Sequence, residues 1–217
     1  MSPRLLHRRL PLVLVGLTAL PIAGACAQAP IKPPGTRPAM VLIAYHTEHG
    51  TTEQMARAAA EGVRRVPGAD AVLKPVDQVA KEDLARADAI ILGAPTYYAN
   101  IPGRMKVILD DWAWKWKVDF TDKVGGALST GGGPAAGKEQ VLVSLLLYML
   151  NNRMIVAGPL YEDATGQDRW GEIGATAMTG PLDPGVSPSE LESARRLGQR
   201  IARLALWRSP AAAAPLK

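Results

Sequence analysis

Three short polar segments each follow a run of apolar residues, and their residue types suit the binding of a phosphorylated aromatic ligand. The first is HTEHGTT, residues 46–52, which leads directly into a stretch with helical periodicity. A helix N-terminus offers free backbone N–H groups and a favourable dipole to an anion, and the threonines add hydroxyl donors. The residues of this predicted phosphate site are Thr47, Glu48, His49, Gly50, Thr51 and Thr52. The alternative is a plain polar turn with a threonine as helix cap.

The second segment, APTYYANIPG at residues 94–103, carries two adjacent tyrosines. Pro95 stiffens this segment, and Tyr97 and Tyr98 present flat amphipathic rings on which an aromatic ligand can stack. The predicted ligand contacts of this segment are Pro95, Thr96, Tyr97, Tyr98 and Asn100. The alternative is that the two tyrosines form a contact between subunits.

The third segment, STGGGPAAGKE at residues 129–139, is rich in glycine, so its backbone can approach a ligand closely. Its predicted ligand contacts are Ser129, Thr130, Gly131, Gly132 and Gly133. Residues 132–138 also spell the GxxxxGK of nucleoside-triphosphate-binding loops. Glu139, however, stands where that motif needs a serine or threonine to hold magnesium, and its carboxylate repels phosphates. We therefore exclude an NTPase and expect Lys138 to be a solvated residue at a helix start.

Two histidines, His46 and His49, lie in the first segment. A protonated histidine there would pair with a phosphate dianion and make the affinity for the ligand depend on pH. The alternative is that both side chains only fill the loop. Because no third ligand accompanies them, we expect no metal site.

Five apolar runs are spaced so that helices fit between them, which predicts a doubly wound α/β fold. The expected strands are residues 40–45, 71–76, 89–93, 124–129 and 153–157. Pro75 removes a ladder donor, which places the second strand at an edge. The expected architecture is a three-layer sandwich around a five-stranded parallel sheet in the order 2-1-3-4-5. In such sheets, ligands bind beyond the carboxyl ends of the strands, where the three polar segments lie.

The helices of this fold have recognisable starts. Thr51 is the expected N-cap of the first helix, with Gln54 completing a capping box. The start of the last helix is signalled by Ser187, Pro188 and Glu190. The run 142–150 is apolar on all sides, so we expect it to be largely buried. The segment 160–187, with Trp170, is expected to be a lid over the ligand or an oligomer contact.

The ends of the chain differ from the middle. Residues 1–27 combine three arginines with an apolar run, which predicts a secretory signal peptide. Adjacent arginines at 8–9 match a twin-arginine signal, and Cys26 is either lipidated or incidental to an ordinary cleavage site. The remaining divisions are a proline-rich linker at 28–38, one folded domain at 39–208 and a tail at 209–217. An exported protein, periplasmic or anchored to the membrane through a lipidated Cys26, is the expectation.

The order of these motifs resembles the flavodoxin-like proteins, and in particular the WrbA-type NAD(P)H:quinone oxidoreductases. The matching segments are 53–62, 93–96, 129–131, 139–140 and 174–176. The resemblance covers about residues 40–206 and implies FMN as cofactor. It places the FMN phosphate at residues 47–52 and the flavin ring against residues 96–98 and 129–133.

The chain also departs from this family, mainly where substrate binds. The family has an insertion between the second and third strands that helps to build a tetramer, and here it is missing. A family histidine near the flavin is replaced by Asn151 or Asn152, and His49 replaces an aromatic residue implicated in nicotinamide contact. Trp114 or Trp116 corresponds to a substrate-facing tryptophan. The substrate contacts implied are His49, Trp116 and Asn152.

Three functions compete. The first is an FMN oxidoreductase that uses NAD(P)H to reduce a quinone or another small-molecule acceptor; its flavin carries the chemistry, so no catalytic side chain is needed. The second is an exported flavodoxin-like electron carrier fed by a membrane or protein donor, because nicotinamides are normally unavailable outside the cytoplasm. The third is a flavin-free binding module. The formal net charge is +5, or +2 without residues 1–27, and no basic stripe appears, which excludes nucleic acid. A homo-oligomer is a further expectation.

Overall fold

The computed structural model describes residues 37–160, 173–179 and 185–208. The predicted signal peptide, Cys26, Trp170, the tail and most of the linker lie outside these residues, as does most of the predicted lid. No helix of the described part combines the length and apolarity needed to cross a membrane.

A parallel sheet forms the middle layer of the molecule. Its strands are β1 (Ala39–Tyr45), β2 (Ala69–Pro75), β3 (Ala89–Pro95), β4 (Val124–Gly131), β5 (Ile155–Val156) and β6 (Ala175–Met178). The order β2-β1-β3-β4-β5 confirms the predicted 2-1-3-4-5, with β2 and its Pro75 at an edge. The predicted α/β sandwich is therefore confirmed.

The fifth strand differs from its prediction, because it is shorter than 153–157 and is followed by a sixth. β5 pairs only with the first two residues of β4, whereas β6 pairs with the last four. The chain leaves the sheet at Gly158 and Pro159, whose carbonyls both accept from the Arg200 guanidinium, at 3.0 and 3.3 Å. Proline has no N–H with which to continue the ladder, and two segments therefore share this edge.

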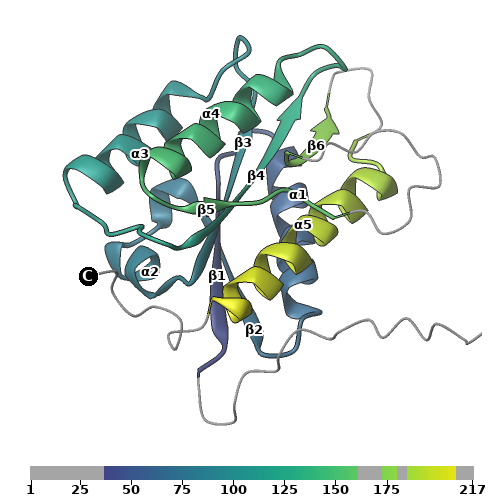
Figure 1. Cartoon of the computed structure of the whole chain (residues 1–217). Coiled ribbons are helices and arrows are strands. Elements are labelled where there is room, and N and C mark those ends of the chain that lie inside the picture. Colours follow the sequence, from purple (N-terminus) through teal and green to yellow (C-terminus); the bar gives the residue numbers. More distant parts are fainter. Residues whose placement is uncertain (1–36, 161–172, 180–184, 209–217) are drawn as a thin grey trace, which may run out of the picture.

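Helices cover both faces of the sheet (Figure 1). One face holds α1 (Thr51–Arg64) and α5 (Pro188–Trp207); the other holds η1 (Val76–Gln78), α2 (Lys81–Arg86), α3 (Gly103–Trp114) and α4 (Lys138–Asn151). Alternate residues of each strand enter the two cores: Val41 and Ile43 pack under α1 and α5, and Leu42 lies in the opposite core. Burial on both faces explains the unbroken apolar runs.

The predicted cap of the last helix is confirmed. Ser187 is the N-cap of α5, and its hydroxyl accepts from the backbone N–H of Glu190 at 3.3 Å. The Glu190 carboxylate is buried and accepts from two backbone N–H groups, that of Ser187 at 2.8 Å and that of Met178 in β6 at 2.9 Å. This carboxylate therefore joins the start of α5 to β6.

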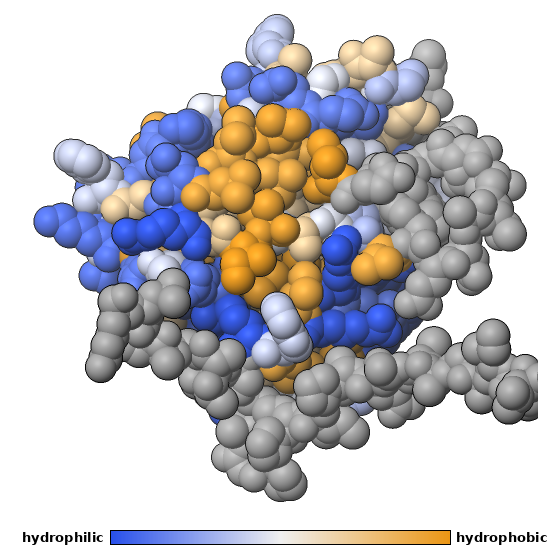
Figure 2. Space-filling view, viewed as in Figure 1, coloured by the Kyte–Doolittle hydropathy of each residue, from blue (hydrophilic) through white to orange (hydrophobic). Residues whose placement is uncertain are grey.

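The prediction that residues 142–150 are largely buried is wrong for one side of α4. Leu142, Leu145 and Met149 lie in the core, but Leu147 and Leu150 are 58% and 51% exposed. Figure 2 shows apolar side chains gathered over α4 in the middle of this face. α4 covers the sheet with one side only, as a helix of an outer layer does. The residues on its exposed side are nevertheless apolar, like those on its buried side.

Candidate functional site

The three polar segments meet at the carboxyl ends of the strands. The hydroxyls of Thr52, in the first segment, and Thr130, in the third, lie 2.8 Å apart. The backbone N–H of Thr96, in the second segment, donates to the Thr130 carbonyl at 2.8 Å. The rings of His46 and Tyr97 make an edge contact with centroids 6.5 Å apart. Direct contacts therefore link all three pairs of segments into one site.

The first segment turns into α1 at a glycine. Gly50 is the N-cap of α1 in a left-handed conformation, with φ 84° and no side-chain cap. Its N–H donates to the Thr47 hydroxyl at 3.0 Å, and its carbonyl accepts from Gln54 at 3.1 Å. The prediction of a Thr51 cap with a Gln54 capping box is therefore wrong, since Thr51 is already the first helical residue. The first N–H groups of α1 have no intrahelical acceptor and suit an anion.

The hydroxyl pair of Thr52 and Thr130 gives a testable link between the first and third segments. Both residues are buried, so Thr52→Val leaves the Thr130 hydroxyl without this partner and is expected to lower the free energy of unfolding by about 1–2 kcal/mol. The double variant Thr52→Val/Thr130→Val removes both hydroxyls and is expected to recover part of that loss. Urea denaturation measures both. The single variant Thr130→Val completes the comparison. A loss in the double variant equal to the sum of the losses in the two single variants would contradict the pairing.

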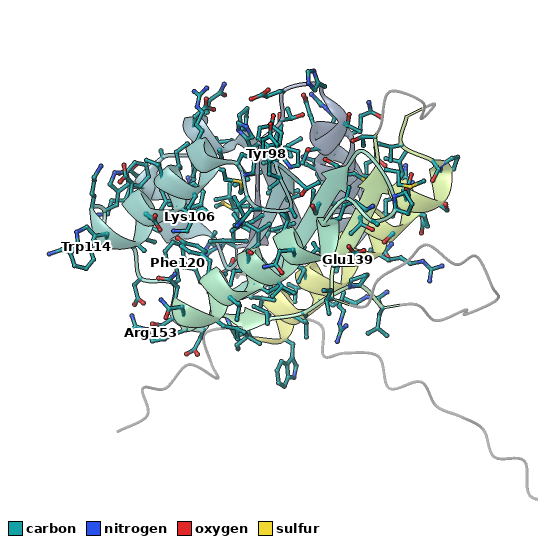
Figure 3. The ribbon with its side chains drawn as sticks, turned by 90° about the horizontal axis from the view of Figure 1, so that it is seen from above. Tyr98, Lys106, Trp114, Phe120, Glu139 and Arg153 are labelled. Atoms are coloured by element: carbon teal, nitrogen blue, oxygen red, sulfur yellow. The ribbon has the colours of Figure 1, made fainter. Side chains whose placement is uncertain are left out.

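The second segment forms a strained turn. Tyr97 and Asn100 exchange two backbone hydrogen bonds, at 2.9 and 3.0 Å, around Tyr98 and Ala99. Both central residues have positive φ, 49° and 60°, which costs a non-glycine residue about 1–3 kcal/mol. The Tyr98 side chain is fully exposed, and Figure 3 labels it in a view from above. The turn therefore holds a large flat ring in solvent.

Tyr97 and Asn100 support this turn. Burial raises the pKa of the Tyr97 phenol, and the neighbouring Glu48 carboxylate raises it further, so this phenol stays protonated as a donor. The Asn100 side-chain oxygen accepts from the backbone N–H of Ile101 at 2.8 Å. Pro95 ends β3 directly before the turn. The predicted ligand contacts of the second segment therefore lie close together, and Tyr98 is the most exposed of them.

The third segment wraps around a lysine. Lys138 is 4% exposed, and its ammonium donates to the carbonyls of Gly133 at 2.5 Å and Pro134 at 3.4 Å. The expectation of a solvated Lys138 is therefore wrong, because the loop closes back on this side chain. A Cβ at Gly131 would lie 2.8 Å from the Lys138 Cγ and 2.6 Å from the Thr96 Cγ2, so the segment has room only for glycine there.

Ser129 supplies a buried polar group at the start of this segment. Its side chain is fully buried, and among the described residues its hydroxyl has no hydrogen-bond partner. A buried hydroxyl without a partner is costly in a folded protein unless a ligand or water satisfies it. A ligand contact at Ser129 stays a prediction.

The site also includes β6, which sequence reasoning missed as a strand. β6 runs beside Leu128 to Gly131, and the N–H of Thr179 donates to the Gly131 carbonyl at 2.8 Å. The signal that the sequence offered for it was the family match at 174–176. β6 therefore closes the side of the third segment.

His46 is placed to respond to pH. Its side chain is 11% exposed, and its Nε2 lies 4.0 Å from a Glu48 carboxylate oxygen. Burial lowers the pKa of His46 from 6.5, against the opposing effect of Glu48, so the folded protein favours the neutral ring. A histidine with a lowered pKa stabilises the fold fully above the unfolded pKa and loses that stabilisation as pH falls through the folded pKa.

We therefore expect the free energy of unfolding to fall as pH is lowered from about 7.5 to 5. His46→Gln is expected to show a shallower fall over this range, measured by urea denaturation at each pH. Wild type and His46→Gln are first compared at pH 8, where the imidazole is neutral in the folded and in the unfolded protein. The difference between their free energies of unfolding at this pH measures the effect of the substitution alone. Parallel pH profiles for the two proteins would contradict a lowered pKa at His46.

Two predicted substrate contacts, Trp116 and Asn152, lie away from this site in the same chain. Trp116 follows the C-terminal end of α3, and Asn152 caps the C-terminal end of α4. Both helices run back from the carboxyl ends of the strands, so these residues lie at the opposite end of the sheet. Figure 3 shows the neighbouring Trp114 projecting from the far end of α3. His49, by contrast, lies exposed in the first segment.

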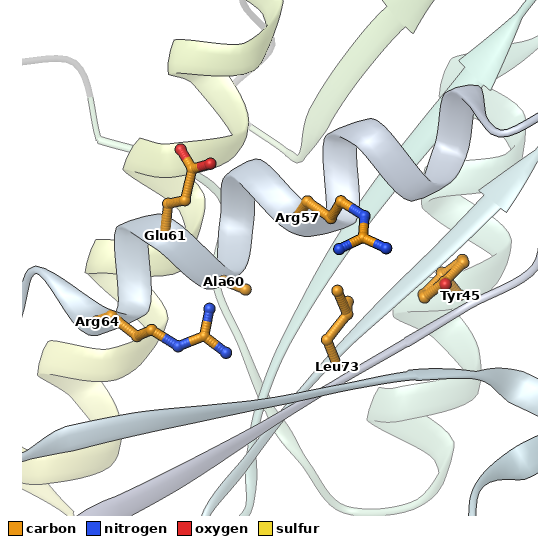
Figure 4. A pocket seen from close by; sticks show the side chains of 6 residues that line it. All are labelled: Tyr45, Arg57, Ala60, Glu61, Arg64 and Leu73. Carbon is orange, nitrogen blue, oxygen red and sulfur yellow. The ribbon is translucent and has the colours of Figure 1, made fainter.

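Two cavities border α1. One of about 280 Å³ adjoins the first segment; its lining includes His46, Glu48, Asp77 and Arg104. Another of about 450 Å³ lies between α1 and β2 (Figure 4). The charged groups of the second cavity are engaged elsewhere: Glu61 accepts from Arg195 at 2.8 Å, Arg64 donates to the Ala71 carbonyl at 3.0 Å, and Arg57 pairs with Glu53. It is a solvated groove apart from the three joined segments.

The fold and the joined segments define a flavodoxin-type sandwich with a candidate ligand site at the carboxyl ends of its strands. A family model for NADPH-dependent FMN reductases matches residues 69–165. The chain is 34% identical to a flavodoxin of Aquifex aeolicus, over 75% of this chain and 84% of the relative. It is 32% identical to an NAD(P)H dehydrogenase (quinone) of Geobacter sulfurreducens, over 76% of this chain and 97% of the relative.

Solved structures agree with these relatives. A WrbA-like flavodoxin from Agrobacterium tumefaciens superposes with a TM-score of 0.60 and 26% identity, over 77% of this chain and 97% of that one. The chain therefore belongs to the flavodoxin-like family of FMN-binding oxidoreductases, and the resemblance stated from its motifs is confirmed.

Proposed function

We propose that this protein binds FMN at the three joined segments and uses it to transfer electrons from NAD(P)H to a quinone. The observation that carries the proposal is the direct linkage of the segments through Thr52, Thr130 and Thr96, because it gathers a phosphate-type loop and two ring-lining loops at one edge. NAD(P)H as donor is supported by the FMN reductase family model and by the quinone dehydrogenase relatives.

The residues present fit FMN on two structural grounds. Gly50 has no heavy atom within 4 Å of the position where a Cβ would stand, which leaves space before the N-terminus of α1 for a phosphate. The buried Ser129 hydroxyl lacks a partner among the described residues, and FMN is rich in polar ring atoms that can pair with it. Both features lie in the predicted phosphate-binding and ring-lining segments.

Each segment has a distinct task in this function. The N-terminus of α1 holds the phosphate through backbone N–H groups. The turn at Tyr97–Asn100 and the glycine-rich segment after β4 would line the ring and shield it from water. FMN, when bound, would supply the two-electron redox chemistry. The protein contributes position and electrostatics, so no side chain need act as acid or base.

The test begins with the visible absorption spectrum of the purified protein after FMN is added and excess FMN removed. A bound-flavin spectrum is expected, followed by bleaching with NADH or NADPH and recovery on addition of a soluble quinone. A colourless protein would overturn FMN binding and favour a binding module. Bound flavin that NAD(P)H does not reduce would overturn the NAD(P)H-dependent function.

A second candidate is an electron carrier, which the similarity to a flavodoxin favours. It also fits the proposal that residues 1–27 direct export, since nicotinamides are normally unavailable outside the cytoplasm. The same spectrum distinguishes the two functions, because the carrier binds FMN but is not reduced by NAD(P)H. Fractionation of cells that express the full chain tests export. The readouts are the cell fraction in which the protein is found and the length of the mature protein.

A further inference from the structure

Lys138 places a cation inside the glycine-rich segment. Its stem lies against Gly131, since a Cβ there would stand 2.8 Å from the Lys138 Cγ, and the Thr96 methyl group lies 2.6 Å from the same position. Its ammonium ends on the carbonyls of Gly133 and Pro134. Gly131, Gly133 and Thr96 belong to the segments expected to line the flavin ring, so the ammonium lies within the wall of the ring site.

No carboxylate of the described residues lies within 4 Å of this ammonium; its partners there are the two backbone carbonyls. Such a charge, 4% exposed, is poorly screened by solvent and acts on nearby groups through a medium of low dielectric constant. The segment therefore holds one buried positive charge at a fixed position, whereas the neighbouring Glu139 is exposed to solvent.

Reduction changes the charge of a flavin. A hydride brings two electrons and one proton, so the reduced ring holds one negative charge more than the oxidised ring. A cation in the wall of the site therefore interacts more favourably with the reduced form.

We propose that Lys138 tunes the electron affinity of the bound cofactor, by stabilising reduced FMN relative to oxidised FMN. The inference rests on FMN binding in the proposed function, but not on NAD(P)H or quinone as substrates. Lys138 acts through the ring-lining segment as a positioning and electrostatic residue.

The chain provides a matched control in a second buried lysine. Lys123 is 9% exposed, and its ammonium donates to the carbonyls of Ala87 at 2.6 Å and Ala85 at 3.2 Å. It precedes β4, whereas Lys138 follows the loop at the other end of that strand. Lys123→Gln therefore removes an equivalent buried ammonium at the end of the sheet remote from the cofactor.

The experiment compares wild type, Lys138→Gln, Lys138→Arg and Lys123→Gln, each loaded with FMN. Dissociation constants for oxidised FMN come from fluorescence titration, and the two-electron midpoint potential from spectroelectrochemistry. Lys138→Gln keeps a donor for the loop carbonyls but loses the charge. Its preference for reduced over oxidised FMN is expected to fall about tenfold, which lowers the potential by about 30 mV for a two-electron couple.

Lys138→Arg, which keeps the charge, and Lys123→Gln are expected to hold the wild-type potential. The shift in Lys138→Gln is expected to persist at 0.5 M salt. Salt screens exposed charges over about 3–10 Å at concentrations of about 0.1–1 M, but it screens a buried charge much less. An unchanged potential in Lys138→Gln, even with weaker binding of both redox forms, would overturn the proposal and leave Lys138 a loop-packing residue. Failure of wild type to bind FMN would overturn the proposed function as well.

Discussion

A Gly50→Val variant is expected to lose FMN binding while it keeps its fold. Gly50 has φ 84° at the start of α1, and a Cβ there would stand in open space, with no heavy atom within 4 Å. That space is where we place the phosphate, so valine both distorts the turn and occupies part of the site. We expect the dissociation constant for FMN to rise by at least about 100-fold, measured by titration of flavin fluorescence.

The control is Gly68→Val, because Gly68 has nearly the same φ, 83°, in the turn between α1 and β2. A Cβ there would meet only the Leu206 Cδ2 at 3.6 Å, an ordinary contact. Both variants carry a left-handed valine and are expected to lose about 1–3 kcal/mol of stability. Only Gly50→Val is expected to lose FMN. Equal FMN affinity in the two variants would place the phosphate elsewhere.

The central strands were predictable because their burial leaves a direct mark on the sequence. The runs 40–45 and 89–93 are apolar at every position, since alternate side chains enter two different cores. Pro75 marked the edge strand because a proline cannot complete an interior ladder. These signals depend on local sequence alone, and the sheet order follows from them with the usual handedness of crossovers.

The start of α1 and the fifth strand were not predictable in detail, because they depend on distant contacts or on backbone geometry. Thr51 has the right type for an N-cap, but a left-handed Gly50 takes that position one residue earlier. The division of the last edge between β5 and β6 depends on Arg200 and Glu190, both in α5, which hold the two segments. Neither interaction leaves a pattern in the strand residues themselves.

The sequence indicates which segments form the site better than it indicates the contacts within it. The polar segments were identified from their position after apolar runs, and the structure brings them together. The burial of Lys138 was not predictable, because lysine at a helix start is ordinarily solvated. It becomes buried because Gly137, at φ 85°, folds the loop back over the side chain. The same lack of local signal hid the placement of Trp116 and Asn152 at the far end of the sheet.

Gly198→Ala is expected to cause a large loss of stability. α1 and α5 lie side by side on one face of the sheet (Figure 1), and Gly198 is where they touch. A Cβ at Gly198 would stand 2.0 Å from the Ala59 carbonyl oxygen, and one at Gly62 would stand 2.0 Å from that of Arg195. The obstacle is backbone in both cases, so rotation of a side chain cannot relieve it.

The expected fall in the free energy of unfolding is about 3 kcal/mol, at the upper end of overpacking effects, even though alanine favours a helix by up to about 1 kcal/mol over glycine. Urea denaturation measures it. The matched control is Gly103→Ala at the first position of α3, where a Cβ has nothing within 4 Å and the change is expected to be neutral or slightly stabilising. Similar stabilities for the two variants would show that the helices can separate without cost.

This variant also separates the fold from the site. Gly198 contacts the middle of α1, whereas the phosphate-binding loop lies at its N-terminus, so a protein that still folds should keep an intact loop. A ligand that binds only the folded state stabilises it by an amount set by its concentration and dissociation constant. Saturating FMN is therefore expected to raise the stability of Gly198→Ala by the same increment as wild type, and that of Gly50→Val by none. A smaller increment in Gly198→Ala would mean that the contact between α1 and α5 also positions the loop.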